Sequence, residues 1–170
     1  MKITREYHEK LINLLEKEYN LYCDLKEVLI LEKRALSEFD FEKLSELNIR
    51  KEGVLLNIVE IKNNRNKLID EIIDNFKIEN DVNLSFLEKI SEAELKQVYA
   101  DFKEKFKNIG IRIKNLNEIN KFVIETSLKF IEKSLNMLNQ NVAPSTYSNY
   151  GKVMSKAYSP SSPSFYTGKI

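Results

Sequence analysis

Apolar residues recur with a helical period along the first 140 residues of the chain. In residues 4–37 they form two adjacent rows, which together are wider than the seam of a two-stranded coiled coil. This first helix is therefore expected to contact two others. The rows are Tyr7, Leu11, Leu14, Leu21, Leu25 and Val28, and beside them Leu15, Tyr22, Leu29 and Leu36. Glu18 and Glu32 interrupt the first row, and we expect their carboxylates to stay solvated at its edge.

A second helix is predicted over residues 41–76, after a short connection in which Asp40 is a suitable N-cap. Short connections join antiparallel neighbours, so the first two helices should form a hairpin. Lys51 and Arg65 interrupt the apolar row of the second helix and could meet the glutamates of the first. Gly53 lies in the middle of this helix, which predicts a close approach of a neighbouring helix there.

A short helix over residues 84–90 follows a polar linker, and we expect it to close one end of the bundle. Ser91 and Glu94 then have the spacing of a capping box, which predicts the start of a third long helix that continues to about residue 140. Gly110 indicates a bend or a close crossing within it.

The apolar pattern of the third long helix changes after Asn117. Polar side chains now occupy the former seam positions, at Asn120, Ser127 and Ser134. Two apolar rows flank them. One contains Val123, Phe130 and Met137, and the other contains Ile124, Leu128, Ile131, Leu135 and Leu138.

Helix lengths favour a binding role for these two rows. At a rise of 1.5 Å per residue, the first two helices are each about 50 Å long and the third about 70 Å, so the third would overhang by about 20 Å. A monomer rarely leaves such an apolar surface exposed. The surface is expected to capture a helix of another protein; alternatively, it mediates dimerisation or is covered by the chain's own tail.

Residues 141–170 have a different composition, with all three prolines, four tyrosines and many serines. They show no helical period and are expected to be disordered or only conditionally ordered. The predicted organisation is therefore a helical domain over residues 1–140 and a flexible, low-complexity tail over residues 141–170.

Composition excludes several classes of partner. The 170 residues include 27 basic and 26 acidic side chains, and a net charge of +1 gives no concentrated basic face for nucleic acid. Charges interrupt every apolar run, so no stretch is expected to insert stably into a membrane. Cys23 is the single cysteine, which rules out an internal disulfide and fits a reducing cytoplasm.

Catalytic chemistry is not indicated. His8 is the single histidine, and neither a metal site nor a nucleophile-base set can be assembled from it and Cys23. The chain has no glycine-rich phosphate loop, and its carboxylates occur at helix-surface spacing beside lysines. We therefore expect no enzyme activity, no cofactor and no metal.

Residues 116–151 contain a distinctive series of residues. Leu-Asn-x-x-Asn occurs at Leu116, Asn117 and Asn120, and an amphipathic run follows. A proline, a tyrosine and a glycine then occur at Pro144, Tyr147 and Gly151. This pattern resembles that of the FlgN family of flagellar type III export chaperones. The order of the long helices is also similar, whereas the longer Ser/Pro/Tyr tail and the additional Tyr150 depart from the pattern.

The resemblance implies a chaperone that binds the C-terminal helical segments of the hook-filament junction proteins FlgK and FlgL in the cytoplasm. Tyr147 would contact the export-gate protein FlhA. The client surface implied for the third long helix is Val123, Ile124, Leu128, Phe130, Ile131, Leu135 and Leu138.

The sequence thus predicts an all-α, antiparallel three-helix bundle or coiled coil with an extended third helix and a flexible tail. Its predicted function is export of FlgK and FlgL. Two alternatives remain open: a FliT-type chaperone of the filament cap, and a structural coiled-coil protein that self-associates through the same rows.

Overall fold

The computed structural model describes residues 3–78 and 82–141, and side chains as far as residue 138. Four helices follow one another in these ranges: α1 (Arg5–Glu38), α2 (Phe41–Phe76), α3 (Leu84–Ile90) and α4 (Ala93–Asn141). The described residues contain no strand, and the predicted all-α bundle is confirmed. The chain divides into two units, Met1–Leu128 and Lys129–Ile170. The predicted domain division at residue 140 stays a prediction, and the tail lies outside the described residues.

Local sequence signals account for most helix ends. The Asp40 carboxylate accepts a hydrogen bond from the backbone N–H of Lys43 at 2.9 Å, so the predicted N-cap of α2 is confirmed. Asn83 caps α3 in the same way, by accepting from the N–H of Phe86 at 3.0 Å. Phe39 and Lys77 end α1 and α2 in the left-handed conformation, with φ of 55° and 49°.

The predicted capping box at the start of α4 does not form. The Ser91 hydroxyl is buried and has no hydrogen-bond partner within the described part of the chain. Ser91 instead ends α3, because its backbone N–H donates to the carbonyl of Leu87. Ser91 is therefore the C-cap of α3 and not the N-cap of α4.

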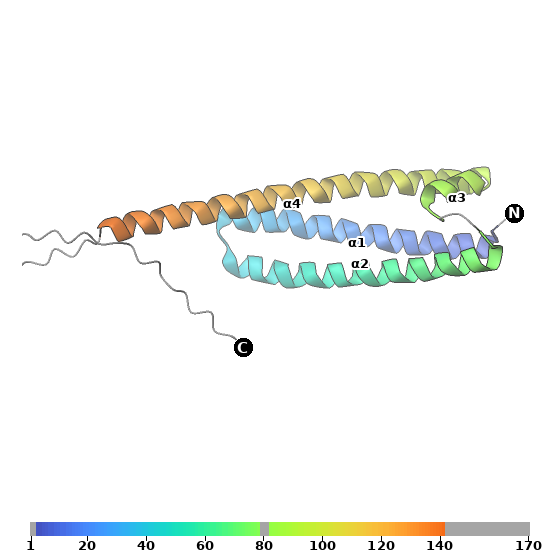
Figure 1. Ribbon diagram of the computed structural model, residues 1–170, viewed down its shortest axis with the longest axis horizontal. Helices are drawn as coiled ribbons and strands as arrows, with labels where there is room; N and C mark the ends of the chain where they lie inside the picture. Colours follow the sequence, from blue (N-terminus) through green and yellow to red (C-terminus); the bar gives the residue numbers. More distant parts are fainter. Residues whose placement is uncertain (1–2, 79–81, 142–170) are drawn as a thin grey trace, which may run out of the picture. The chain divides into compact units, whose positions relative to one another are not determined.

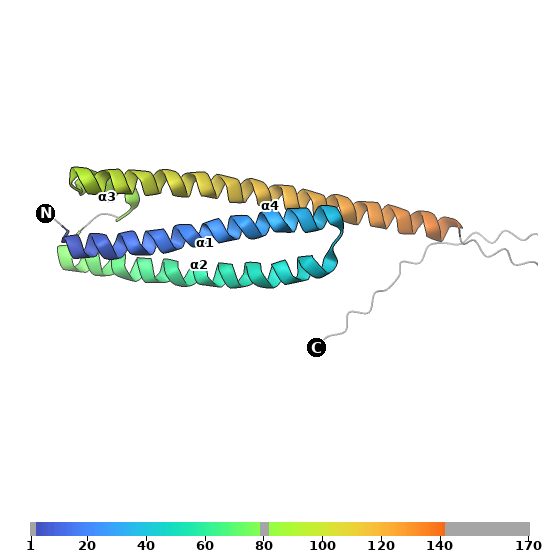
Figure 2. The same cartoon turned by 180° about the vertical axis from the view of Figure 1, so that it is seen from behind.

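The three long helices of the first unit run up, down and up. Glu18 pairs with Arg65 and Glu32 with Lys51, so α1 and α2 are antiparallel. In contrast, His8 contacts Tyr99 and Glu32 contacts Asn120, which makes α1 and α4 parallel. Figures 1 and 2 show α1 flanked by α2 and by the N-terminal part of α4.

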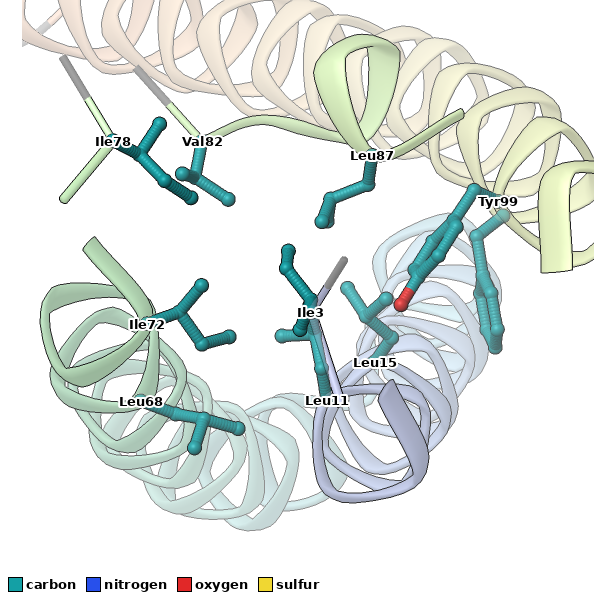
Figure 3. Close-up of a cluster of buried hydrophobic side chains, with 10 residues drawn as sticks. Ile3, Leu11, Leu15, Leu68, Ile72, Ile78, Val82, Leu87 and Tyr99 are labelled. Atoms are coloured by element: carbon teal, nitrogen blue, oxygen red, sulfur yellow. The ribbon is translucent and has the colours of Figure 1, made fainter. Parts of the chain in front are cut away.

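The largest apolar cluster closes the end of the unit that holds the start of α1, and we call it the base. Figure 3 shows side chains from every surrounding segment converging there. The buried members are Ile3, Leu11, Leu15, Leu68, Ile72, Ile78, Val82, Leu87, Tyr99 and Phe102. Leu87 comes from α3, which confirms that this short helix closes one end of the bundle.

Two smaller clusters continue the core along the bundle. The first joins all three long helices, with Leu25, Leu29 and Ile58 buried and Ile113 and Leu116 packed against them. The second is formed by α1 and α2, and its buried members are Val28, Ala35 and Leu47. The core therefore becomes smaller from the base towards the connection between α1 and α2.

Glu18 and Glu32 are buried, so the expectation that they stay solvated was wrong. The exposed fraction of Glu18 is 2%, and Arg65 donates to its carboxylate at 2.5 Å. Lys51 donates to Glu32 at the same distance, which confirms the expected pairing. Burial raises the pKa of Glu18, and the positive charge of Arg65 acts in the opposite direction.

No neighbouring helix approaches either helical glycine closely within the described residues, contrary to the close approach expected at Gly53. A Cβ atom added to Gly53 or Gly110 would meet no atom within 4 Å outside its own helix. Packing within the described residues therefore explains neither glycine.

None of the described helices is both long enough and apolar enough to cross a bilayer.

Candidate functional site

Asn120 anchors α4 to α1. Its exposed fraction is 3%, and its side-chain amide donates to the Leu29 carbonyl at 3.0 Å and to the Glu32 carboxylate at 2.9 Å. Lys51 of α2 donates to the other oxygen of Glu32. Glu32, Lys51 and Asn120 thus form a polar layer that connects all three long helices. Because Asn120 occupies a seam position, this polar contact replaces the apolar packing of the preceding turns.

Apolar side chains that follow the polar layer within the first unit are mainly exposed. Ile124 and Leu128, both predicted to bind a client, are exposed, whereas Val123 is half-buried. Phe122 has an exposed fraction of 68% and was not predicted as a site residue. Phe122 lies off both apolar rows, so the helical period gave no signal for it.

The last turns of α4, within the second unit, show the same exposure. Phe130, Ile131, Leu135 and Leu138, four of the predicted client-binding residues, are exposed, and so is Met137. Ser134 is half-buried, and its hydroxyl donates to the Phe130 carbonyl one turn earlier at 2.9 Å. This bond satisfies the hydroxyl within the helix, so the apolar row is not interrupted by an unpaired donor.

Helical spacing places five of the seven predicted residues in one row. Ile124, Leu128, Ile131, Leu135 and Leu138 follow one another at steps of four, three, four and three residues along α4. Such steps keep side chains on one face of a helix. Val123 and Phe130 belong to the neighbouring row, one heptad apart. We call these seven residues the α4 surface. Tyr147, the predicted gate-binding residue, lies outside the described residues.

The buried titratable side chains at the base form hydrogen bonds within the core. His8 is buried at the base, and its Nδ1 lies 2.7 Å from the Tyr99 hydroxyl in a hydrogen bond. Burial lowers the pKa of His8, and the charge of Glu92 partly opposes this shift. Burial also raises the pKa of Tyr99. Sequence reasoning missed this pair, although Tyr99 lies four residues after Leu95 in the apolar row.

No group of three or more histidine, cysteine or acidic residues within the described ranges could hold a metal ion. Cys23 is half-buried and free, and it lies on α1 several turns from His8. The α4 surface, in contrast, offers apolar contact area on a helix that is already formed. It is suited to burying the apolar face of another helix.

Comparison with known proteins gives one family. The family model described as FlgN protein matches residues 1–154, which is most of the chain and includes all of the α4 surface. Neither the curated proteins nor the solved structures contain a match to the sequence. The match extends over the whole described bundle, far beyond the residues that carried the resemblance. The chain belongs to the FlgN family, and this membership supports the role of a flagellar export chaperone.

Proposed function

We propose that this chaperone binds the C-terminal helical segments of FlgK and FlgL through the α4 surface and delivers them to the export-gate protein FlhA. The exposure of the apolar row on α4 is the observation that carries the proposal, since six of the seven residues are exposed. The helix needs no folding to present them, because it is continuous from Ala93 to Asn141. A client helix would bury its own apolar face against this row in the cytoplasm.

The strength of such a complex follows from its apolar area. At about 25 cal/mol per Å², burial of about 800 Å² gives a gross term near 20 kcal/mol. Lost translational freedom and the ordering of the client segment remove most of it. Micromolar to nanomolar binding results, which holds the client during transfer and still permits its release at the gate.

Calorimetric titration of the full chain with the C-terminal segments of FlgK and FlgL tests the client site. Ile131→Asp should reduce binding below detection, because it introduces a charge into the centre of the row. Circular dichroism should show unchanged helix content, since Ile131 is exposed. Asn136→Asp is the matched control, because it adds the same charge at an exposed position off the row and should bind normally.

Two outcomes would overturn the client proposal. Loss of the fold in Ile131→Asp would make this residue part of the core. Absence of binding together with a stable dimer in light scattering would assign the row to self-association instead.

The gate contact is proposed for Tyr147, on the resemblance of Pro144, Tyr147 and Gly151 to the family pattern. Tyr147→Ala should leave client affinity unchanged and weaken binding to the cytoplasmic domain of FlhA. Tyr150→Ala is the matched control and should retain both. Equal loss of client and gate binding in Tyr147→Ala would assign the tail to the client site.

A further inference from the structure

The outward face of α2 is apolar, although its other face already contributes to the core. Leu47 and Ile58 are buried against α1. Ile49 and Leu56, with exposed fractions of 71% and 65%, follow a different row one heptad apart. At 100° per residue, this row is on the side of the helix opposite to the buried one. Val59 is exposed beside Leu56 and extends the apolar area.

Gly53 lies within this outward row, four residues after Ile49 and three before Leu56. A glycine inside a helix is unfavourable, and a Cβ atom here would meet only open space. The described chain therefore gives no packing reason for it. Between two exposed apolar side chains, a missing side chain lets the backbone of another helix approach closely.

Carboxylates surround the row. Glu42, Glu46, Glu52 and Glu60 are exposed and lie within about one helix quadrant of the Ile49–Leu56 line. Glu46 pairs with Lys43, whereas the other three make no ion pair with any described residue. Arg50, the nearest basic side chain after Ile49, is directed to Glu27 of α1 at 3.9 Å. The apolar row is thus bordered mainly by unneutralised negative charge.

The negative charge beside the row distinguishes between the kinds of partner that could bind there. A second copy of the chain, docked through the same face, would place glutamates against glutamates, which is unfavourable. An anionic lipid surface would be repelled as well. A helix with lysine or arginine on both sides of its own apolar row satisfies the carboxylates and fills the space above Gly53.

We infer that the outward face of α2, centred on Ile49, Gly53 and Leu56, docks a basic amphipathic helix of another protein. The surface lies on a different helix from the α4 surface, so it neither requires nor replaces the proposed client site. A chaperone with both could hold a client and a second, basic helical protein at the same time.

Two synthetic helical peptides test the inference on the full-length chain. Both carry the same leucine row; one has lysines on either side of it and the other has glutamates. Calorimetry should show binding of the lysine peptide and at least tenfold weaker binding of the glutamate peptide. Leu56→Asp should weaken binding of the lysine peptide at least tenfold, whereas Asn66→Asp, exposed on α2 away from the row, should not.

A substitution of Gly53 should reduce binding without destabilising the fold. Gly53→Gln should raise the midpoint of thermal unfolding, because glutamine is the better helix former, and yet weaken binding of the lysine peptide at least tenfold. Gly110→Gln is the matched control, since Gly110 is equally open on α4. It should raise the midpoint to a similar extent and leave peptide affinity unchanged.

Reversing the border charges should reverse the preference. The double variant Glu52→Lys with Glu60→Lys should bind the glutamate peptide more tightly than the lysine peptide, whereas Glu104→Lys on α4 should keep the original order. Three results would overturn the inference. They are no binding of the lysine peptide, binding that survives Leu56→Asp but is lost in Ile131→Asp, and a dimer of the unmodified chain that Leu56→Asp dissociates.

Discussion

The base and the polar layer differ in what holds the helices together. At the base, α1, α2, α3 and α4 contribute buried apolar side chains, and His8 and Tyr99 form a neutral hydrogen-bonded pair among them. In the polar layer, a buried carboxylate is shared between Lys51 and Asn120. The base supplies apolar burial, whereas the polar layer sets the position of α4 on α1 by directional bonds. After that fixed point, the apolar residues of α4 are mainly exposed.

The largest effect is expected where a buried charge loses its partner between these two regions. Arg65→Met should lower the free energy of unfolding by about 3–5 kcal/mol, because Glu18 would remain buried and unpaired. The double variant with Glu18→Leu should recover most of this loss, since it buries no charge. Urea unfolding followed by circular dichroism measures both. Equal stability of the single and double variants would show that Glu18 finds water or another partner.

Truncation of one leucine at the base and one on the α4 surface tests the contrast between buried and exposed apolar residues. Leu11→Ala at the base should lower the free energy of unfolding by about 2–5 kcal/mol, because this side chain is almost fully buried. Leu128→Ala should change it by less than about 0.5 kcal/mol. Urea unfolding of both variants measures these changes in the free energy of unfolding. A large loss in Leu128→Ala would place that residue in the core and remove it from the α4 surface.

The polar layer should contribute less to stability than the Glu18–Arg65 pair or the buried Leu11. Asn120→Ala should lower the free energy of unfolding by about 1–2 kcal/mol, because two hydrogen bonds from its amide are lost. Asn117→Ala, at an exposed position one turn earlier, is the control and should be nearly neutral. The Asn120→Ala substitution should accelerate backbone hydrogen exchange more in the part of α4 that lies beside Leu29 and Glu32 of α1 than at the base. Uniform acceleration would mean that the layer does not act locally.

The smallest effect concerns the neutral pair at the base. Because burial lowers the pKa of His8, the unfolded chain takes up a proton at a higher pH than the folded chain. The contribution of neutral His8 to the free energy of unfolding is therefore fully present above about pH 6.5. It falls as the pH is lowered towards the folded-state pKa, by at most about 1.4 kcal/mol per pH unit. His8→Gln keeps a hydrogen-bonding group beside Tyr99 and should remove this part of the pH dependence between pH 5.5 and 7. An unchanged dependence of stability on pH in this variant would mean that carboxylates cause it.

The helices were predictable because their signals are local. Asp40 caps the second helix directly after the first one ends, and the apolar period extends over many turns. The predicted bounds of the first three helices therefore differ from the observed ones by at most one residue. Glu18 and Glu32 were misjudged because burial of a carboxylate depends on a partner from another helix, although Arg65 and Lys51 had been noted as candidates. Ser91 was misjudged because two adjacent helix ends compete for one side chain.

The candidate site was only partly accessible to the same reasoning. Periodicity placed Ile124, Leu128 and Ile131 in one row, and all three side chains are exposed, but their role in client binding stays a prediction. Periodicity could not reveal the outward face of α2, because Ile49 and Leu56 look like any other apolar pair until the buried face is known. Gly53 was assigned to a close contact within the chain for the same reason.

The parallel alignment of α1 and α4 also sets an order of events during synthesis. Glu18 and Arg65 are 47 residues apart in the chain, whereas His8 and Tyr99 are 91 apart. The α1–α2 hairpin can therefore close on the emerging chain before α4 leaves the ribosome, since N-terminal segments appear first and near contacts close fastest. Until α4 docks, the apolar side chains of α1 that it covers, such as Leu29, stay exposed. The nascent export chaperone then exposes the kind of surface that it is proposed to protect in others.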